Sequence, residues 1–150
     1  MSRDINNKYW DEELETLPRE ELEKRQLADL QEIVKLVGMD SLSAQDRLTL
    51  DVAQSIREDF LQQNAFLDID CYTPLQKQYG ILDLIFTYED RARRAIEAGA
   101  DIEEICASPI HERIARAKTE PNDGYETAFA AVKEAIAKEL DALIAGADRA

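Results

Sequence analysis

Histidine and cysteine, two side chains that often carry out catalysis or hold metals, are few in this sequence. His111 is the sole histidine, and the two cysteines, Cys71 and Cys106, are too far apart for a CxxC pair. A Ser-His-Asp or Cys-His arrangement would have to use His111, which follows Pro109 at the start of a short predicted helix. We therefore interpret His111 as a surface or capping residue and expect both thiols to be reduced.

Motifs that bind phosphate or metal are missing from the sequence. No GxxxxGK[ST] loop, GxGxxG motif or GxSxG motif occurs. Asp68 and Asp70 could bind a cation through alternating carboxylates, but no third acid or loop glycine accompanies them, so a solvated turn is the better interpretation. We expect this chain to have no catalytic residue, no metal and no cofactor of its own.

The most distinctive segment is 56–66, which reads IREDFLQQNAF. Apolar residues lead into it at four-residue spacing and share one helical face: Leu48, Val52, Ile56 and Phe60. Three amides then break the pattern, and Phe66 follows two residues later. The ordinary interpretation is a helix end followed by a core phenylalanine, because core packing is the usual role of a lone Phe.

The size and charge of the chain limit its class. It has 150 residues, of which 45% are hydrophobic, and its formal net charge is -14. Such a charge argues against nucleic acids and anionic membranes as partners, because both are polyanions. No apolar run approaches the roughly 18 residues that span a bilayer, and the residues after Met1 show no signal region. We expect a soluble, cytoplasmic protein without direct membrane insertion.

Prolines, glycines and capping residues predict an all-α bundle of about five to six helices. A helix that begins near Pro18 should end at Gly38, and Ser43 opens the next with a near capping box. Thr73 and Pro74 supply the cap and first turn of a third. The predicted helices span about 18–38, 43–63, 73–99, 101–106, 108–118 and 120–145.

Two of these helices have clear apolar faces. The third should bury Leu75, Tyr79, Leu82, Ile85, Ala92 and Ile96. The last has a heptad-like pattern on Tyr125, Phe129, Val132, Ile136, Leu140 and Leu143. We divide the chain into an acidic helical segment (1–30), a helical bundle domain (31–145) and a frayed tail (146–150).

From about residue 31 to residue 143 the chain resembles the C-terminal helical domain of the catalytic A subunit of archaeal/vacuolar-type (A/V-type) ATP synthases. The matching pieces include LQEIVKLVG at 30–38, DRL at 46–48, KQY at 77–79 and the segment 110–118. The string REDFLQQNAF at 57–66 is the most specific of them, since helical periodicity alone does not dictate its order.

The resemblance implies a site that this chain completes only with a nucleotide domain it lacks. Phe66 would lie against the adenine ring of ATP, and Gln63, Asn64 and Ala65 would shape the edge of that pocket. ATP or ADP with Mg²⁺ would belong to the parent subunit.

The resemblance also implies a non-catalytic role and a set of partners. The remaining helices would couple the state of the nucleotide domain to the central rotor stalk. Partners would be the rotor stalk and neighbouring ATP synthase subunits, in the head that lies on the cytoplasmic side of the membrane. Apolar surface that the parent subunit would cover could also pair two copies of the chain.

Residues 1–30 resemble the opening of phenylacetate–coenzyme A ligases, an adenylate-forming family. The similarity rests on the segments 8–13 and 15–22, and it suggests a fusion or chimera joined near Gln31. Convergence of an acidic amphipathic helix would explain it as well. Two alternatives to the ATP synthase interpretation therefore stay open: a truncated adenylate-forming fragment and a generic acidic helical interaction module.

Overall fold

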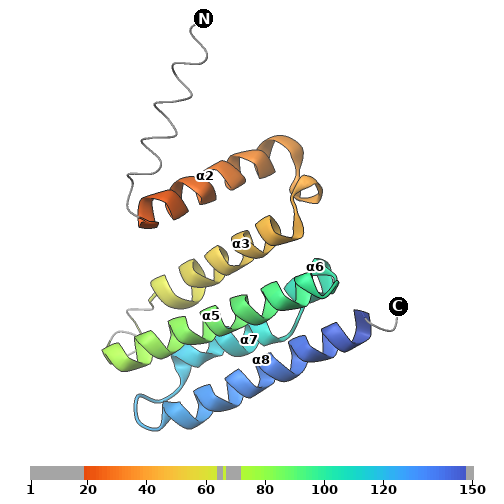
Figure 1. Ribbon diagram of the computed structural model, residues 1–150. Coiled ribbons are helices and arrows are strands. Elements are labelled where there is room, and N and C mark those ends of the chain that lie inside the picture. The colour runs from red at the N-terminus through yellow and green to blue at the C-terminus, as the bar shows by residue number, and fades with distance from the viewer. Residues whose placement is uncertain (1–18, 64–65, 67–71, 148–150) are drawn as a thin grey trace, which may run out of the picture. The chain divides into compact units, whose positions relative to one another are not determined.

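Figure 1 shows the computed structural model, which describes residues 19–63, 66 and 72–147. Every regular element within these residues is helical, and none of them forms a strand. The predicted all-α class is confirmed. Asp68 and Asp70, considered above as cation ligands, lie outside the described residues.

Residues 1–42 and 43–150 form two separate compact units. The first contains α2 (Arg19–Val37) and a short 3₁₀ turn, η1 (Met39–Ser41). As predicted, the helix stops at Gly38, whose φ of 88° is left-handed and suits a residue without a Cβ. The joint that we predicted near Gln31 falls inside α2.

The second unit opens with α3 (Ala44–Ser55) and continues directly into η2 (Ile56–Leu61), a π-helix. The predicted cap is confirmed, because Ser43 Oγ accepts a hydrogen bond from the Asp46 backbone N–H at 3.1 Å. We expected one helix to about Gln63. The predicted length is nearly right, since η2 ends at Leu61. Its turns are wider than those of an α-helix, however, and the Gln62 N–H donates to the Arg57 carbonyl five residues earlier.

The next helices are α5 (Leu75–Glu97), α6 (Ile102–Cys106) and α7 (Ile110–Arg116), followed by the 3₁₀ turn η3 (Ala117–Thr119). The cap of α6 is as predicted, since the Asp101 carboxylate accepts from the Glu103 N–H at 2.9 Å. The start of α5 is not. Pro74, not Thr73, is its N-cap, and the Thr73 carbonyl accepts a hydrogen bond from the Gln78 side-chain amide at 2.9 Å.

The last helix, α8 (Tyr125–Ala147), starts later than the Glu120-Pro121 pair predicted. Glu120 has an extended backbone with ψ of 143°. The Lys77 ammonium holds this segment in place by donating to the carbonyl oxygens of Lys118 at 3.0 Å and Glu120 at 2.5 Å. The two carbonyl oxygens therefore accept hydrogen bonds from a buried lysine, and no helical turn begins at Pro121.

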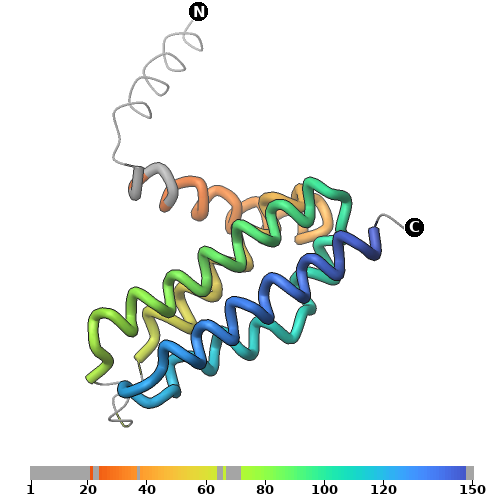
Figure 2. The backbone as a smooth tube through the Cα atoms, turned by 60° about the horizontal axis from the view of Figure 1, so that its bottom comes forward, coloured from red at the N-terminus to blue at the C-terminus, as the bar shows by residue number. Residues whose placement is uncertain are grey.

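Helices α5 and α8 lie side by side and run in the same direction, while α3 and α7 run opposite to them (Figures 1 and 2). The parallel pair is in register, with a constant offset of fifty residues between partners: Asp83 pairs with Lys133, and Arg91 pairs with Asp141. Gly80 permits the close approach, because a Cβ there would lie 2.8 Å from the Phe129 ring.

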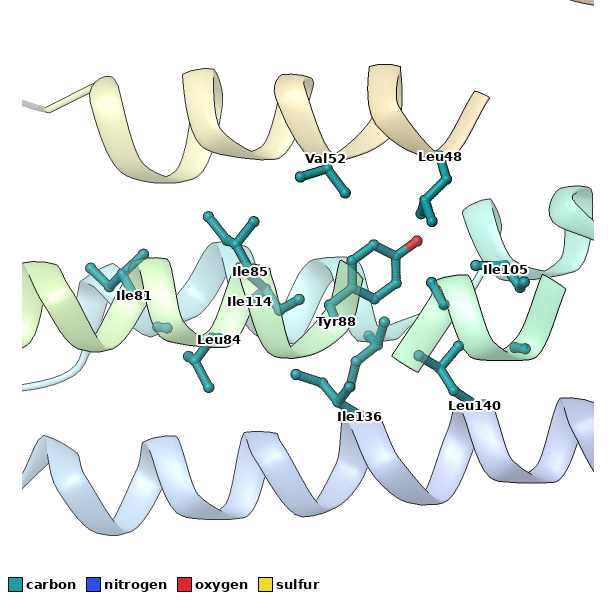
Figure 3. Packing of buried hydrophobic residues seen from close by; sticks show 14 of the residues in the cluster. Leu48, Val52, Ile81, Leu84, Ile85, Tyr88, Ile105, Ile114, Ile136 and Leu140 are labelled. Carbon is teal, nitrogen blue, oxygen red and sulfur yellow. The ribbon is translucent and has the colours of Figure 1, made fainter. Parts of the chain in front are cut away.

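The core of the second unit fills the space between these helices (Figure 3). Tyr88, Leu84 and Ile85 of α5 are fully buried and face partners on the surrounding helices, among them Leu48, Val52, Ile105, Ile114, Ile136 and Leu140. The predicted face of α5 was wrong at its first turns. Leu75 and Tyr79 are 75% and 72% exposed, whereas Lys77 is buried.

Candidate functional site

The amide-rich corner leaves its aromatic residue in solvent. Phe66 is 97% exposed, so the ordinary interpretation as a core phenylalanine is wrong. Gln63 is exposed as well, while Asn64 and Ala65 lie outside the described residues. The core does not need Phe66, and its side chain is accessible to a binding partner.

The chain entering the corner is fixed by contacts on both sides of η2. Ser55 Oγ donates to the Asp59 carboxylate at 2.5 Å, and Lys118 Nζ donates to the Glu58 carbonyl at 3.2 Å. The second bond connects η2 to η3, sixty residues further along the chain. Where the structure describes it, the approach to the corner is therefore held by the bundle.

Large apolar side chains are also exposed on both sides of the corner in sequence. This set, which we call the corner patch, consists of Leu61, Phe66, Tyr72, Leu75 and Tyr79, each at least 65% exposed. Scattered exposed apolar residues are normal in globular proteins, but five of them between residues 61 and 79 favour a surface that another protein element covers.

A second polar site lies inside the bundle, where α3, α5 and α7 meet. Tyr88 donates its hydroxyl proton to Asp51 Oδ2 at 2.8 Å, and the same hydroxyl oxygen lies 3.2 Å from His111 Nε2. His111 Nε2 is also 3.5 Å from Asp51 Oδ2, and the His111 and Tyr88 rings meet edge to face with centroids 4.8 Å apart. We call these three residues the polar bracket.

The bracket corrects our interpretation of His111 as a surface or capping residue. Its side chain is only 26% exposed and is part of an interhelical network. The sequence contained no spacing signal for it, because Asp51 and Tyr88 are far from His111 along the chain. A single histidine near the first residue of a short helix can lie on the surface or bond to side chains of other helices, and its sequence context does not distinguish the two.

Burial sets the electrostatics around the bracket. Loss of solvent raises the pKa of Asp51, against the opposing effects of His111 and the Tyr88 hydroxyl. Burial, with the neighbouring Asp51 carboxylate, also raises the pKa of Tyr88 above its ordinary range. The same two causes raise the pKa of the Cys106 thiol to about 11, so that this cysteine is a poor nucleophile.

An open pocket of about 520 Å³ lies beside the bracket between α3, η2 and α7. Its walls are mainly carboxylates and hydroxyls, with His111 and Cys106 at one side: Asp51, Ser55, Glu58, Asp59, Ser108 and Glu112. Among the described residues no group of three His, Cys, Asp or Glu side chains is arranged to hold a metal ion.

Comparison with known families decides between the interpretations left open by the sequence. Residues 20–106, more than half of the chain, match the family described as the C-terminal domain of V and A type ATP synthase. The chain belongs to this family. The match begins at residue 20 and therefore includes residues 20–30, which we had placed in the ligase-like segment.

Individual relatives agree with the family match. The chain is 48% identical over 118 residues to the V-type ATP synthase alpha chain of Acetivibrio thermocellus, and 48% identical over 119 residues to that of Thermoanaerobacter pseudethanolicus. Each alignment covers 79% of this chain and 20% of the relative. With the alpha chain of Clostridium perfringens the identity is 55% over 91 residues, which cover 61% of this chain and 15% of that one.

The chain thus spans about a fifth of the length of the curated relatives it matches. Within the part of the chain that the structure describes, no helix is both long and apolar enough to span a membrane.

Proposed function

We propose that this domain acts as the non-catalytic C-terminal domain of a V-type ATP synthase alpha chain and couples the state of a nucleotide-binding domain to a rotor stalk. Coupling of this kind needs a rigid body with a contact surface for the neighbouring domain. The parallel α5–α8 pair and the buried core of the second unit provide the rigid body. The corner patch provides the surface.

The exposure of Phe66 is the observation that carries the proposal. A phenylalanine that is 97% exposed and follows η2, which Lys118 ties to the bundle at Glu58, is suited to a contact made with a partner. In this proposal Phe66 lies against the adenine ring, and Gln63, Asn64 and Ala65 shape the edge of the pocket. Aromatic stacking of this kind contributes about 1 kcal/mol.

The corner fits one part of a nucleotide only. Phe66 can cover one face of a purine ring, and the amide of Gln63 can donate and accept hydrogen bonds at its edge. Phosphate and Mg²⁺ need charged groups, which in this proposal belong to the nucleotide-binding part of the subunit. Bound MgATP would supply the free energy of the coupling, while this chain's residues orient the base.

The test combines this chain with the rest of a relative. The alpha chain of Acetivibrio thermocellus without its C-terminal fifth is mixed with the 150-residue chain, and complex formation and MgATP binding are measured by calorimetry. We expect the mixture to bind MgATP more tightly than either part, and the isolated chain to show no measurable affinity. Micromolar binding of MgATP by this chain alone would contradict the proposal.

Two variants separate the adenine contact from general effects. Phe66→Ala should weaken MgATP binding by the mixture roughly fivefold, the equivalent of about 1 kcal/mol, without changing the stability of the isolated chain. Phe86→Ala is the matched control, because Phe86 is a half-exposed phenylalanine of α5 outside the corner patch. Equal losses of MgATP affinity in both variants would rule out a specific role for Phe66.

The corner patch also predicts the behaviour of the chain alone. Two copies could cover their patches by pairing, but each carries a net charge of -14, which opposes association at low ionic strength. We therefore propose a homodimer that forms only when salt screens this repulsion, measurable by sedimentation at two ionic strengths. Addition of the nucleotide-binding part should dissociate it.

A further inference from the structure

The polar bracket places a titratable pair where three helices of the bundle meet. Asp51 belongs to α3, Tyr88 to α5 and His111 to α7, and Tyr88 is fully buried. Neither the corner patch nor the proposed adenine contact uses these residues. The polar bracket is therefore separate from the proposed adenine contact. Its protonation states follow from the hydrogen-bond donors and acceptors of its three side chains.

The proton count fixes the state of His111. While Asp51 is ionised it can only accept hydrogen bonds, so the single proton of the Tyr88 hydroxyl is given to Asp51 Oδ2. The hydroxyl oxygen then has only lone pairs left for His111 Nε2, 3.2 Å away. His111 Nε2 must therefore carry a proton in both the neutral and the charged ring. Protonation occurs at Nδ1 and leaves the two hydrogen bonds of the bracket in place.

We propose that the polar bracket is a pH-responsive lock between α3, α5 and α7, in which protonation of His111 turns its contact with Asp51 into an ion pair. The neutral ring already has the geometry that the charged ring needs, with Nε2 3.5 Å from Asp51 Oδ2. Locking therefore requires no rearrangement of side chains. Both partners are about one-quarter exposed or less, so salt and water screen the pair less than a surface pair.

Other charged groups surround the bracket. The titratable groups that face it from the packed elements are Arg47, Glu58, Asp59, Cys106 and Glu112. Three of these are carboxylates, and Arg47 is a cation. Asp59 also opposes ionisation of Asp51.

The sign of the pH dependence can be stated for Asp51. Burial raises its pKa in the folded chain, so the folded state takes up a proton more readily than the unfolded state. The corresponding stability is fully present at low pH and is lost as pH rises through the folded pKa. Asp51 alone therefore makes the bundle less stable at high pH than at low pH. The lock needs the other state of Asp51, since it acts only while Asp51 is ionised and His111 is protonated.

The experiment uses the 150-residue chain, in which the sole histidine gives unambiguous imidazole signals. Nitrogen-15 NMR at about pH 8, above the usual titration range of histidine, should show a ring protonated on Nε2. A ring protonated on Nδ1 would overturn the proton count and, with it, the lock. This measurement needs no variant and does not depend on how well variants fold.

A double-mutant cycle then tests the lock itself. Asp51→Asn keeps an acceptor for Tyr88 without the charge, and His111→Gln keeps a donor that does not titrate. At about pH 6 we expect the two substitutions to be coupled by a factor of roughly five in the unfolding equilibrium constant. At about pH 8 we expect no coupling, which is a factor of about one. The cycle cancels the general effect of the net charge. Equal coupling at both pH values would overturn the proposal.

Discussion

The close crossing of α5 and α8 makes Gly80→Ala a direct test of the packing. The new Cβ would lie 2.8 Å from both Cδ2 and Cε2 of Phe129, whereas ordinary contacts begin at 3.4 Å. The ring has little room to withdraw, because Phe129 is only 6% exposed and packs against Tyr125 with centroids 5.0 Å apart. The ring or one of the two helices must shift.

The size of the effect follows from two opposing contributions. Overpacking of a filled core costs about 1–3 kcal/mol. Alanine gains up to about 1 kcal/mol over glycine inside a helix. We therefore expect Gly80→Ala to lower the free energy of unfolding by up to about 2 kcal/mol. Gly146→Ala in α8 is the matched control, because nothing lies within 4 Å of its added Cβ, so that the helical gain alone remains.

The assay is urea unfolding followed by helical circular dichroism, which compares midpoints at an unchanged slope. Gly80→Ala should move the midpoint down and Gly146→Ala should leave it unchanged or move it up. In a Phe129→Ala background the penalty at Gly80 should disappear, because the clashing ring is gone. If Gly80→Ala stabilises the chain as much as Gly146→Ala does, the inferred close approach of the two helices is wrong.

Two further predictions concern a buried lysine and a partly buried cysteine. Lys77→Met should cost about 2–3 kcal/mol in urea unfolding, because three acceptors around the start of α8 lose their donor. Lys133→Met, which removes a half-exposed ion pair with Asp83, should cost less than about 1 kcal/mol. If the Lys77 and Lys133 variants lose the same stability, the larger contribution of the buried lysine is wrong. In a Cys71→Ser background, Cys106 should react with iodoacetamide at pH 8 about a hundredfold more slowly in the folded chain than in urea, because its pKa is about 11 instead of 9.0. Equal rates would contradict the inferred burial.

The ends of several helices could be predicted from the sequence because local chemistry determines them. Gly38 ends α2 through its own left-handed backbone, and Ser43 and Asp101 cap their helices with bonds that span two or three residues. Such signals depend on neighbours in sequence only. The family could be predicted for the same reason, since the order of residues 57–66 is itself the signal.

The faces of α5 could not be predicted in the same way. Periodicity assigned Leu75 and Tyr79 to the core, but the first turns of α5 bury Lys77 instead. This ammonium is stabilised by carbonyl oxygens more than forty residues away. The same contacts accompany the late start of α8, after Pro121. A different set of long-range contacts, with Asp51 and Tyr88, holds His111 in the polar bracket. A sequence window contains neither partner, and only the folded bundle brings them together.

The π-helical turns of η2 have a consequence for the segment that follows them. A hydrogen bond from residue i to i+5 closes one more residue into each turn than an α-helical bond. One residue corresponds to about 100° of rotation in an α-helix. In the wider turns of η2 each residue therefore rotates the chain by less than that, and the extra residue is absorbed without changing the side from which the chain leaves. Deletion of a single residue between Ile56 and Leu61 would restore α-helical spacing and leave the direction of that exit nearly unchanged.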